Sequence, residues 1–255
     1  MSSRFPTAFV AHGAPFLAVD PAGGEPFRQW GRSVPRPRAF LVVSAHFQRA
    51  PLTIGTTEAL DLLYDFTGFP DALYQVKYAA PGAPWLADRV GQMLAGREMM
   101  RSRRPLDHGV WTPLVHIAPS ADIPVLEISM PHTDSAADLF ETGRRLAPLR
   151  DERVWILGSG NLVHNLGRVD FSGTTPPPGW AAEFDHWIAD VLSRRDWDSL
   201  IDYARRAPAL SLAHPTEEHL RPVLVAAGAA ADDPVQFVLE GWEFGSLSRR
   251  SVQFG

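Results

Sequence analysis

Residues 39–46, with the sequence AFLVVSAH, decide the fold class of this 255-residue chain. The stretch is almost continuously apolar, whereas a strand with one solvent-exposed face alternates apolar and polar side chains. A continuous apolar run of this length is typical of a strand that is covered on both faces. Residues 8–11, 124–130 and 153–157 show the same pattern. We therefore expect several interior strands of one sheet.

Helical patterns lie between these expected strands. Apolar side chains recur at 3.6-residue spacing over residues 86–94, 139–146 and 180–192. Alternation of strands with helices predicts an α/β fold whose mostly parallel central sheet is flanked by helices on both faces. Residues 235–254 alternate better and contain Gly241 and Gly245, so we expect an antiparallel hairpin there and hence a mixed sheet.

The composition is that of an ordinary globular protein, with 45% hydrophobic and 21% charged residues. The Gly- and Pro-rich stretches 20–26, 35–38 and 172–179 are predicted to be loops and are too short for domain linkers. We therefore expect residues 1–255 to form a single catalytic domain, and its oligomeric state stays open.

Charge and hydropathy exclude several classes of partner. The net charge is −5 and the arginines are scattered, which argues against binding to a nucleic-acid backbone. No apolar run approaches the roughly 18 residues that span a bilayer. The N-terminal residues also lack the pattern of a signal peptide, so we expect a cytoplasmic protein without a membrane partner.

The chain contains no cysteine and nine histidines. The absence of cysteine excludes disulfides, thiolate metal sites and a cysteine nucleophile. A metal ion would have to be held by imidazole and oxygen ligands, which favours zinc, iron or manganese.

Histidines follow the ends of three expected strands. His12 follows residues 8–11, His46 follows residues 39–45, and His164 comes shortly after the glycine-rich turn 158–160. Ligands of open α/β sheets bind outside the carboxyl ends of the strands. A single histidine at a strand end is more often structural, but three at equivalent positions predict one shared site.

Two further histidine segments contain prolines. Pro215 suits the first turn of a helix, which would place His214 in extended backbone before it and His219 one turn inside. Both histidines could instead be capping or solvated groups. Pro113 likewise predicts the start of a helix with Thr112 as its cap, so that His108 would lie in the preceding loop.

Other catalytic motifs are missing. The Gly158–Gly160 stretch lacks the remaining glycine of a dinucleotide fingerprint, and Ser159 lacks the flanking pattern of a nucleophile elbow. The sequence also has no phosphate-binding loop and no HExxH zinc motif.

Eight short blocks, in order along almost the whole chain, resemble the class III extradiol ring-cleavage dioxygenases, in the branch of the 4,5-DOPA dioxygenases. Each block alone is weakly specific, whereas the ordered set is highly specific. The blocks are AHGAP (11–15), VSAH (43–46), DFTGFP (65–70), LYQVKY (73–78), LDHGVW (106–111), GSGNLVHNL (158–166), HPTEEH (214–219) and GSLS (245–248).

The resemblance implies a mononuclear non-haem iron(II) site that could also hold zinc. It implies His12, His46 and His219 as metal ligands and His164 as the catalytic acid/base. His108 and His214 would line the substrate pocket. Most ring-cleaving relatives use two histidines and one carboxylate, so His219 in place of the carboxylate would leave the metal more positive.

The implied reaction inserts O₂ into a catechol-type diol such as DOPA. Three protein ligands leave room on the metal for the diol and for dioxygen. A histidine has the pKa needed to take a proton from the second hydroxyl group and return it later, which suits His164. The glycines at 158 and 160 would let the backbone pass close to the substrate ring. Asp65 is interpreted either as a surface charge or as part of a gating loop, and is not assigned to the site.

Two other classes of function remain open. A zinc hydrolase could use the same three histidines with an activated water, and oxygen uptake with a catechol would distinguish the two enzymes. A binding module on the same scaffold is disfavoured because every histidine of the expected site is in place.

Overall fold

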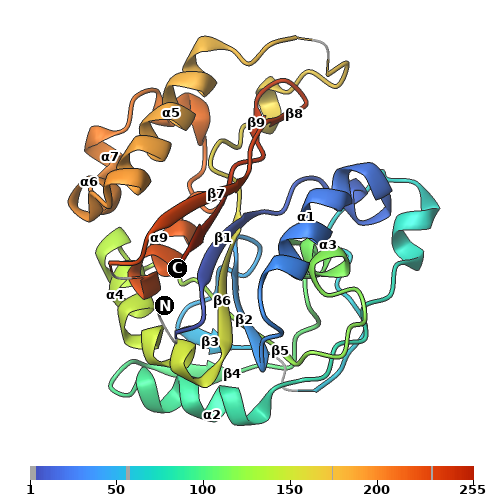
Figure 1. Cartoon of the computed structure of the whole chain (residues 1–255), viewed down its shortest axis with the longest axis vertical. Coiled ribbons are helices and arrows are strands. Elements are labelled where there is room, and N and C mark those ends of the chain that lie inside the picture. The colour runs from blue at the N-terminus through green and yellow to red at the C-terminus, as the bar shows by residue number, and fades with distance from the viewer. Residues whose placement is uncertain (1–3, 56–57, 174, 231) are drawn as a thin grey trace.

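The centre of the protein is an eight-stranded sheet with the order β4-β3-β5-β2-β6-β1-β10-β7 (Figure 1). The structure, a computed structural model, describes residues 4–55, 58–173, 175–230 and 232–255. The strands are β1 Thr7–Ala11, β2 Ala39–Ser44, β3 Leu52–Ile54, β4 Met99–Arg101, β5 Val125–Ile128, β6 Val154–Gly160, β7 Val235–Leu239, β8 Trp242–Glu243, β9 Leu247–Ser248 and β10 Ser251–Phe254. The helices are α1 Pro21–Ser33, α2 Pro84–Met93, α3 His108–Ile117, α4 Ala136–Leu146, α5 Gly179–Arg194, α6 Trp197–Ile201, α7 Tyr203–Arg206, α8 Leu210–Ala213 and α9 Pro222–Ala230, with short 3₁₀ turns at η1 Pro15–Val19, η2 Asp71–Gln75, η3 Ala147–Glu152 and η4 Leu166–Arg168.

The four middle strands pair in parallel, antiparallel pairs join them to the rest of the sheet on both sides, and the edge pair β3-β4 is again parallel. Strand β6 pairs in parallel with both β1 and β2, and β2 pairs in parallel with β5. The tail adds β10 and β7 as an antiparallel hairpin, and β3 runs antiparallel to β5 at the other side. The prediction of a mixed, mostly parallel sheet is confirmed. The short ribbon β8-β9 between the hairpin strands is an addition that the sequence pattern did not predict (Figure 1).

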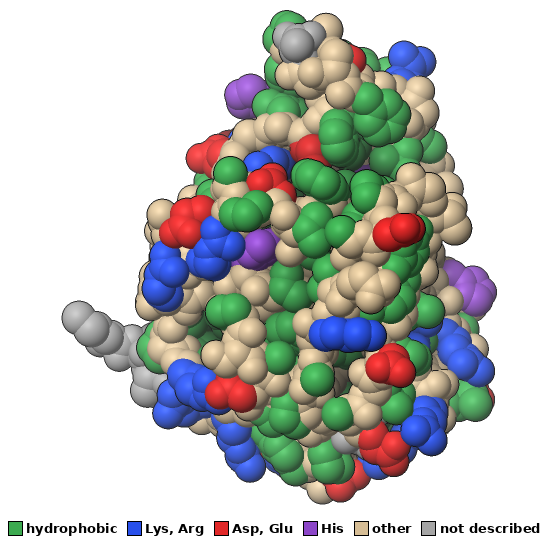
Figure 2. Space-filling model, turned by 90° about the vertical axis from the view of Figure 1, so that its right-hand side faces the viewer, with side chains coloured by type: hydrophobic (Ala, Val, Ile, Leu, Met, Phe, Trp, Pro, Cys, Tyr) green, Lys and Arg blue, Asp and Glu red, His purple; other side chains and the backbone are tan. Residues whose placement is uncertain are grey.

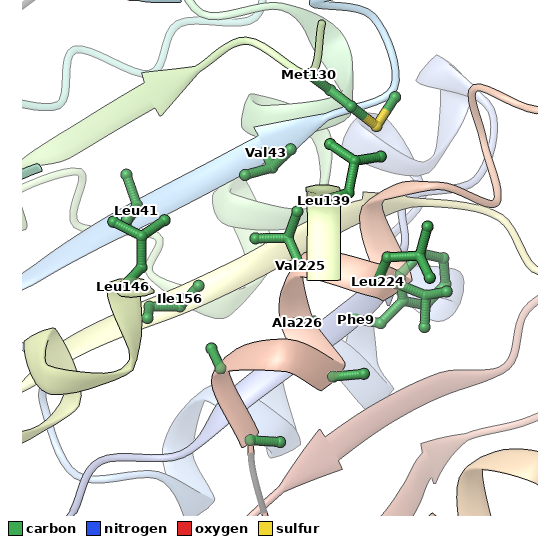
Figure 3. Packing of buried hydrophobic residues seen from close by; sticks show 14 of the residues in the cluster. Phe9, Leu41, Val43, Met130, Leu139, Leu146, Ile156, Leu224, Val225 and Ala226 are labelled. Atoms are coloured by element: carbon green, nitrogen blue, oxygen red, sulfur yellow. The ribbon is translucent and has the colours of Figure 1, made fainter. Parts of the chain in front are cut away.

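Helices cover both faces of the sheet. Neighbouring strand residues point to opposite sides, and in the central strands both sets of side chains are buried. Phe9 packs on the side of α2, α4, α5 and α9, whereas Val10 packs on the side of α1 and α3. Figure 3 shows the first side, where Leu139 of α4 and Val225 of α9 lie near Val43 of β2. Burial on both faces explains the continuous apolar runs in the sequence and confirms the predicted α/β architecture.

Helix α1 corrects the prediction of a loop over residues 20–26. The helix begins at Pro21, whose missing N–H costs nothing at the first helical position. Asp20 caps it by accepting a hydrogen bond from the backbone N–H of Ala22 at 3.0 Å. The glycines and prolines of this stretch therefore belong to a helix start.

Helix α3 begins at His108, not at Pro113 as predicted. A proline inside a helix leaves the carbonyl four residues earlier without its usual donor. That carbonyl belongs to Gly109, and it accepts a hydrogen bond from the Ser159 hydroxyl at 2.5 Å. A tertiary partner from β6 thus allows the helix to extend over Pro113, and it places His108 on the first turn.

The predicted helix over residues 215–219 is also wrong, because these residues form a turn and α9 begins only at Pro222. The carbonyl of His219 accepts a hydrogen bond from the Asn161 backbone N–H at 3.0 Å, so the end of β6 takes a partner that a helix would have used. His214 does lie in extended backbone, with φ −138° and ψ 90°, as expected before a proline.

The surface carries charges of both signs. On the face in Figure 2, Lys and Arg side chains lie beside Asp and Glu side chains, with hydrophobic side chains between them. Across the described residues, every helix is too short or too polar to cross a bilayer.

Candidate metal centre and active site

Three histidines from distant parts of the chain meet at the carboxyl ends of the central strands. His12 directly follows β1, His46 lies just beyond β2, and His219 belongs to the turn before α9. One ring nitrogen of each lies within 4.8 Å of those of the other two. The structure therefore brings together the three residues for which the sequence analysis expected a metal.

The ring nitrogens face one another at a spacing that suits a single ion. The Nε2 atoms of His12 and His46 are 3.3 Å apart. Two imidazole nitrogens bound to one ion at about 2.1 Å and at angles of roughly 90–110° are separated by about 3.0–3.4 Å. The observed spacing fits such an ion.

The hydrogen bonds of His12 leave its Nε2 free for a metal. The Ser159 hydroxyl donates to the Gly109 carbonyl, so it must accept from the Nδ1–H of His12, which lies 2.9 Å away. A proton on Nδ1 leaves a lone pair on Nε2. A partner on the far ring nitrogen is the usual support of a metal-binding histidine.

His219 is oriented in the same way by its neighbour. Its Nδ1–H donates to a carboxylate oxygen of Glu218 at 2.9 Å. Burial alone would raise the pKa of Glu218, but the hydrogen bond from His219 and other donors lower it to about 2. Glu218 is therefore ionised at neutral pH and can hold the Nδ1 proton in place.

His46 and His108 share a carboxylate partner, Asp65. One oxygen of Asp65 accepts hydrogen bonds from Nδ1 of His108 at 2.8 Å and from its backbone N–H at 3.2 Å, and the other lies 3.6 Å from Nδ1 of His46. Burial would raise the pKa of Asp65, but the hydrogen bonds from His108 lower it to about 2. Asp65 thus fixes His108 against His46, with ring centroids 4.0 Å apart.

Burial keeps His12 and His46 neutral. It lowers the pKa of His46 to about 3 and that of His12 well below the usual range, and neighbouring imidazoles act in the same direction. Neutral imidazoles bind metals without first losing a proton, so these two histidines can take an ion at neutral pH.

A second layer holds the backbone of His46. Arg104 donates to the carbonyl of His46 and to Asp107, both at 3.0 Å. Asp107 also accepts a hydrogen bond from the Ser44 hydroxyl at 2.8 Å. The end of β2 is therefore tied to the start of α3.

His164 lies against the metal cluster. Its ring stacks on that of His219 with a centroid distance of 3.6 Å and an interplanar angle of 12°. Burial lowers the pKa of His164 to about 2, with a smaller contribution from His219. His164 also lines the adjoining cavity, so a neutral imidazole borders both the cluster and the space beside it.

The cavity beside the cluster has a volume of about 380 Å³. Its polar end is formed by the four histidines at positions 12, 46, 164 and 219 together with His108 and Asp65. The remaining wall is largely aromatic and aliphatic, with Phe66, Phe69 and Phe244 among its residues.

His214 differs from the expectation that it lines this pocket. Within the described part of the chain, it is not among the residues that border the cavity. It is only 2% exposed, its Nε2–H donates to the Leu162 carbonyl at 2.8 Å, and its ring packs edge-on against Phe184. The proline after His214 keeps the backbone of His214 extended, while the imidazole is buried against the segment that leads to His164.

The glycines at 158 and 160 make room for backbone, not for a substrate ring as expected. A Cβ atom on Gly160 would lie 2.9 Å from the carbonyl carbon of His219, and one on Gly158 would lie 2.8 Å from that of Pro222. Both distances are shorter than real Cβ contacts. Strand β6 can therefore approach the turn that carries His219 only with glycine at these positions.

Sequence reasoning missed the residues that contact the histidine rings directly: Asp65, Ser159 and Glu218. Glu218 is adjacent to His219, so its spacing offered a signal. Ser159 lacks the flanking pattern of a nucleophile, although its place at the end of an expected strand already indicates a position near the site. Asp65 reaches the cluster from a loop, and only its membership of a matching block indicated a role.

The α/β sheet thus gathers three imidazole nitrogens that could hold a metal ion beside a largely apolar cavity. The family described as "Catalytic LigB subunit of aromatic ring-opening dioxygenase" matches residues 7–255. The chain belongs to this family of dioxygenases, which are metal-dependent. The resemblance to class III extradiol dioxygenases is thereby confirmed.

Individual relatives match almost from end to end. The chain is 37% identical to a 4,5-DOPA dioxygenase extradiol of Beta vulgaris, over 97% of this chain and 96% of the relative. It is also 37% identical to the protein of that name in Escherichia coli K12, over 100% of this chain and 96% of the relative. The fold is also similar to the crystal structure of an uncharacterized protein from Escherichia coli K12. The match covers 99% of this chain and 100% of the chain in the crystal structure, with 35% identity and a TM-score of 0.85.

Proposed function

We propose that this protein is an extradiol dioxygenase that opens the ring of a catechol-type substrate with O₂. The facing Nε2 atoms of His12 and His46 at 3.3 Å, with His219 beside them, support a mononuclear metal site most directly. Iron(II) bound there would acidify the diol and activate dioxygen, and zinc could occupy the same ligands. We further propose that residues 1–255 act as one catalytic domain.

In this proposal His164 takes the proton of the second hydroxyl group of the diol, whereas the metal would acidify the first. Its neutral ring borders the cavity and can accept a proton from the second hydroxyl group of the diol. An anionic diol nearby would favour the protonated ring, which can then return the proton during ring opening. Stacking on His219 holds the ring at a fixed distance from the ligand cluster.

His108 and His214 support the reaction in different ways. Asp65 binds the Nδ1 of His108, so Nε2 is the ring nitrogen left to bind an oxygen of the substrate or of O₂. We propose that His214 acts indirectly, because its hydrogen bond to Leu162 steadies the segment that leads to His164.

Loading with metal tests the proposed reaction. Metal analysis of freshly purified protein would be followed by anaerobic loading with Fe(II) and addition of a panel of catechols that includes DOPA, the substrate in the names of the relatives. We expect oxygen uptake and a yellow ring-opened semialdehyde. No uptake with any catechol, together with metal-dependent hydrolysis of esters or amides, would favour the zinc hydrolase.

The role of His164 has its own test. His164→Gln should keep the bound metal and lose turnover by about 100-fold or more, since a positioned acid/base contributes about 10²–10⁴-fold. His186→Gln is the matched control, because His186 is an exposed histidine on α5. Undiminished turnover in His164→Gln would refute the assignment.

A further inference from the structure

The mouth of the cavity gathers exposed hydrophobic side chains. Phe16, Leu166 and Phe171 line the cavity and are 49%, 64% and 78% exposed. Among the described residues only two other large hydrophobic side chains are exposed, Val19 at 36% and Met100 at 46%. Exposed apolar side chains that cluster at a cavity mark a surface that binds an apolar group.

The inner wall offers no partner for a charged substituent. Among the described residues that line the cavity, there is no Lys or Arg, and Asp65 is the one carboxylate. Both oxygens of Asp65 already face His108 and His46. The carboxyl group of Glu243 lies behind the wall, where it accepts a hydrogen bond from the Ala14 amide at 3.4 Å. A carboxylate or ammonium group held against this inner wall would lose part of its water without gaining an ion pair.

Aromatic pairs form much of the wall between the mouth and the histidines. The rings of Phe66 and Phe69 are 5.2 Å apart, and those of Phe171 and Phe244 are 5.3 Å apart. All four residues line the cavity. Such edges and faces suit alkyl or aryl groups, which gain free energy by leaving water.

We propose that the substrates are catechols with an uncharged, apolar ring substituent, and that the cavity disfavours the charged amino-acid side chain of DOPA. This inference rests on the proposed dioxygenase function, because the histidine end of the cavity must take the two ring hydroxyl groups. The substituent then extends along the aromatic wall to the mouth at Leu166 and Phe171.

Binding to the Zn(II)-loaded protein tests the inference apart from turnover. Anaerobic calorimetry would compare 4-propylcatechol with three charged analogues: 3-(3,4-dihydroxyphenyl)propionate, dopamine and L-DOPA. We expect 4-propylcatechol to bind at least about tenfold more tightly than each analogue, since none of the charges finds a partner. Along the series 4-methyl-, 4-ethyl- and 4-propylcatechol, affinity should rise about threefold to fourfold per methylene.

The outcomes separate this inference from the proposed function. Equal or tighter binding of a charged analogue, an affinity that does not rise with chain length, or no binding of any catechol would overturn the inference. Oxygen uptake by the Fe(II)-loaded protein is measured with the same compounds. An apolar preference in binding without any oxygen uptake would support the inference and contradict the dioxygenase function. Oxygen uptake together with tighter binding of a charged analogue would support the dioxygenase function and contradict the inference.

A charge added at the mouth gives a second test. Leu166→Arg should weaken binding of 4-propylcatechol and strengthen binding of the propionate, so that the ratio of the two affinities shifts by about tenfold toward the anion. Met100→Arg is the control, because Met100 is similarly exposed but lies on the edge strand β4. A ratio that Leu166→Arg leaves unchanged would contradict a substituent path along this wall.

Discussion

Adding one methyl group at Gly160 should displace a metal ligand. The Cβ of Gly160→Ala would lie 2.9 Å from the carbonyl carbon of His219 and closer still to its oxygen. Carbon atoms pack best at about 3.5–4.0 Å, so β6 and the His219 turn must separate by more than about 0.5 Å. The same carbonyl accepts the hydrogen bond from Asn161 N–H at 3.0 Å, so this bond must lengthen as well.

The expected effect has a stability part and a binding part. Forcing an extra methyl group into a packed interior costs about 1–3 kcal/mol, which should appear in urea unfolding of the metal-free protein. A shift of His219 away from His12 and His46 should weaken Zn(II) binding by about 10–100-fold, as for the loss of a group that orients a ligand. Competition with a chromophoric chelator measures that affinity.

Two other glycines serve as controls. Gly91 lies in α2 with nothing within 4 Å of the added Cβ, so Gly91→Ala should stabilise the protein by up to about 1 kcal/mol and leave Zn(II) affinity unchanged. Gly158→Ala should destabilise the protein as Gly160→Ala does, but its clash is with Pro222, which is not a ligand, so Zn(II) affinity should fall less. A folded Gly160→Ala protein with wild-type Zn(II) affinity would refute the view that this glycine sets the position of His219.

Two further substitutions test the hydrogen bonds and the buried imidazoles. Ser159→Ala removes the acceptor of His12 and the donor to the Gly109 carbonyl. Chelator competition should then show about 10–100-fold weaker Zn(II) binding, and urea unfolding should show a loss of stability of about 1–3 kcal/mol. Unchanged Zn(II) affinity would contradict the orientation of His12 by the hydroxyl. Burial lowers the pKa of His214 to about 4 from its ordinary value of 6.5, so between these pH values the unfolded chain binds a proton that the folded protein does not, and stability falls as the pH drops through this window. The loss of stability from His214 amounts to about 3 kcal/mol. Urea unfolding at about pH 7 and about pH 4.5 measures it. His214→Gln keeps a donor for the Leu162 carbonyl, and its free energy of unfolding should depend less on pH than that of the wild type. The same dependence in both proteins would assign the effect to the other buried histidines.

The parts of the fold that sequence predicts are those set by local pattern. Strand β2 lies buried on both faces, so its apolar run is continuous and its position is evident without any tertiary information. The meeting of His12 and His46 follows from parallel topology, because β1 and β2 both run parallel to β6 between them and so end at the same edge of the sheet. His219 could be added only through the family resemblance, since no strand ends beside it in the sequence.

The errors fall where a distant partner replaces a local one. Pro113 marks a helix start by the usual rules, yet α3 runs through it because Ser159 satisfies the carbonyl that the proline leaves free. Pro215 does not start a helix because the carbonyl of His219 is bound by Asn161 instead. Asp65 is equally invisible to local rules, since only folding brings its loop to His108. Each missing fact is a contact between segments far apart in the chain.

These contacts converge on one strand end, which explains how His12 and His219, from two distant segments, reach a common geometry. Ser159 orients His12 and completes the first turn of α3, which carries His108. The next residue, Gly160, admits the carbonyl of His219, and the following N–H, from Asn161, binds that carbonyl. Since every link is made by consecutive residues of one rigid central strand, a shift of this strand end must move the imidazoles together. The GSGN stretch therefore acts as the junction that sets the ligand spacing, which is why a methyl group at Gly160 should be felt at the metal.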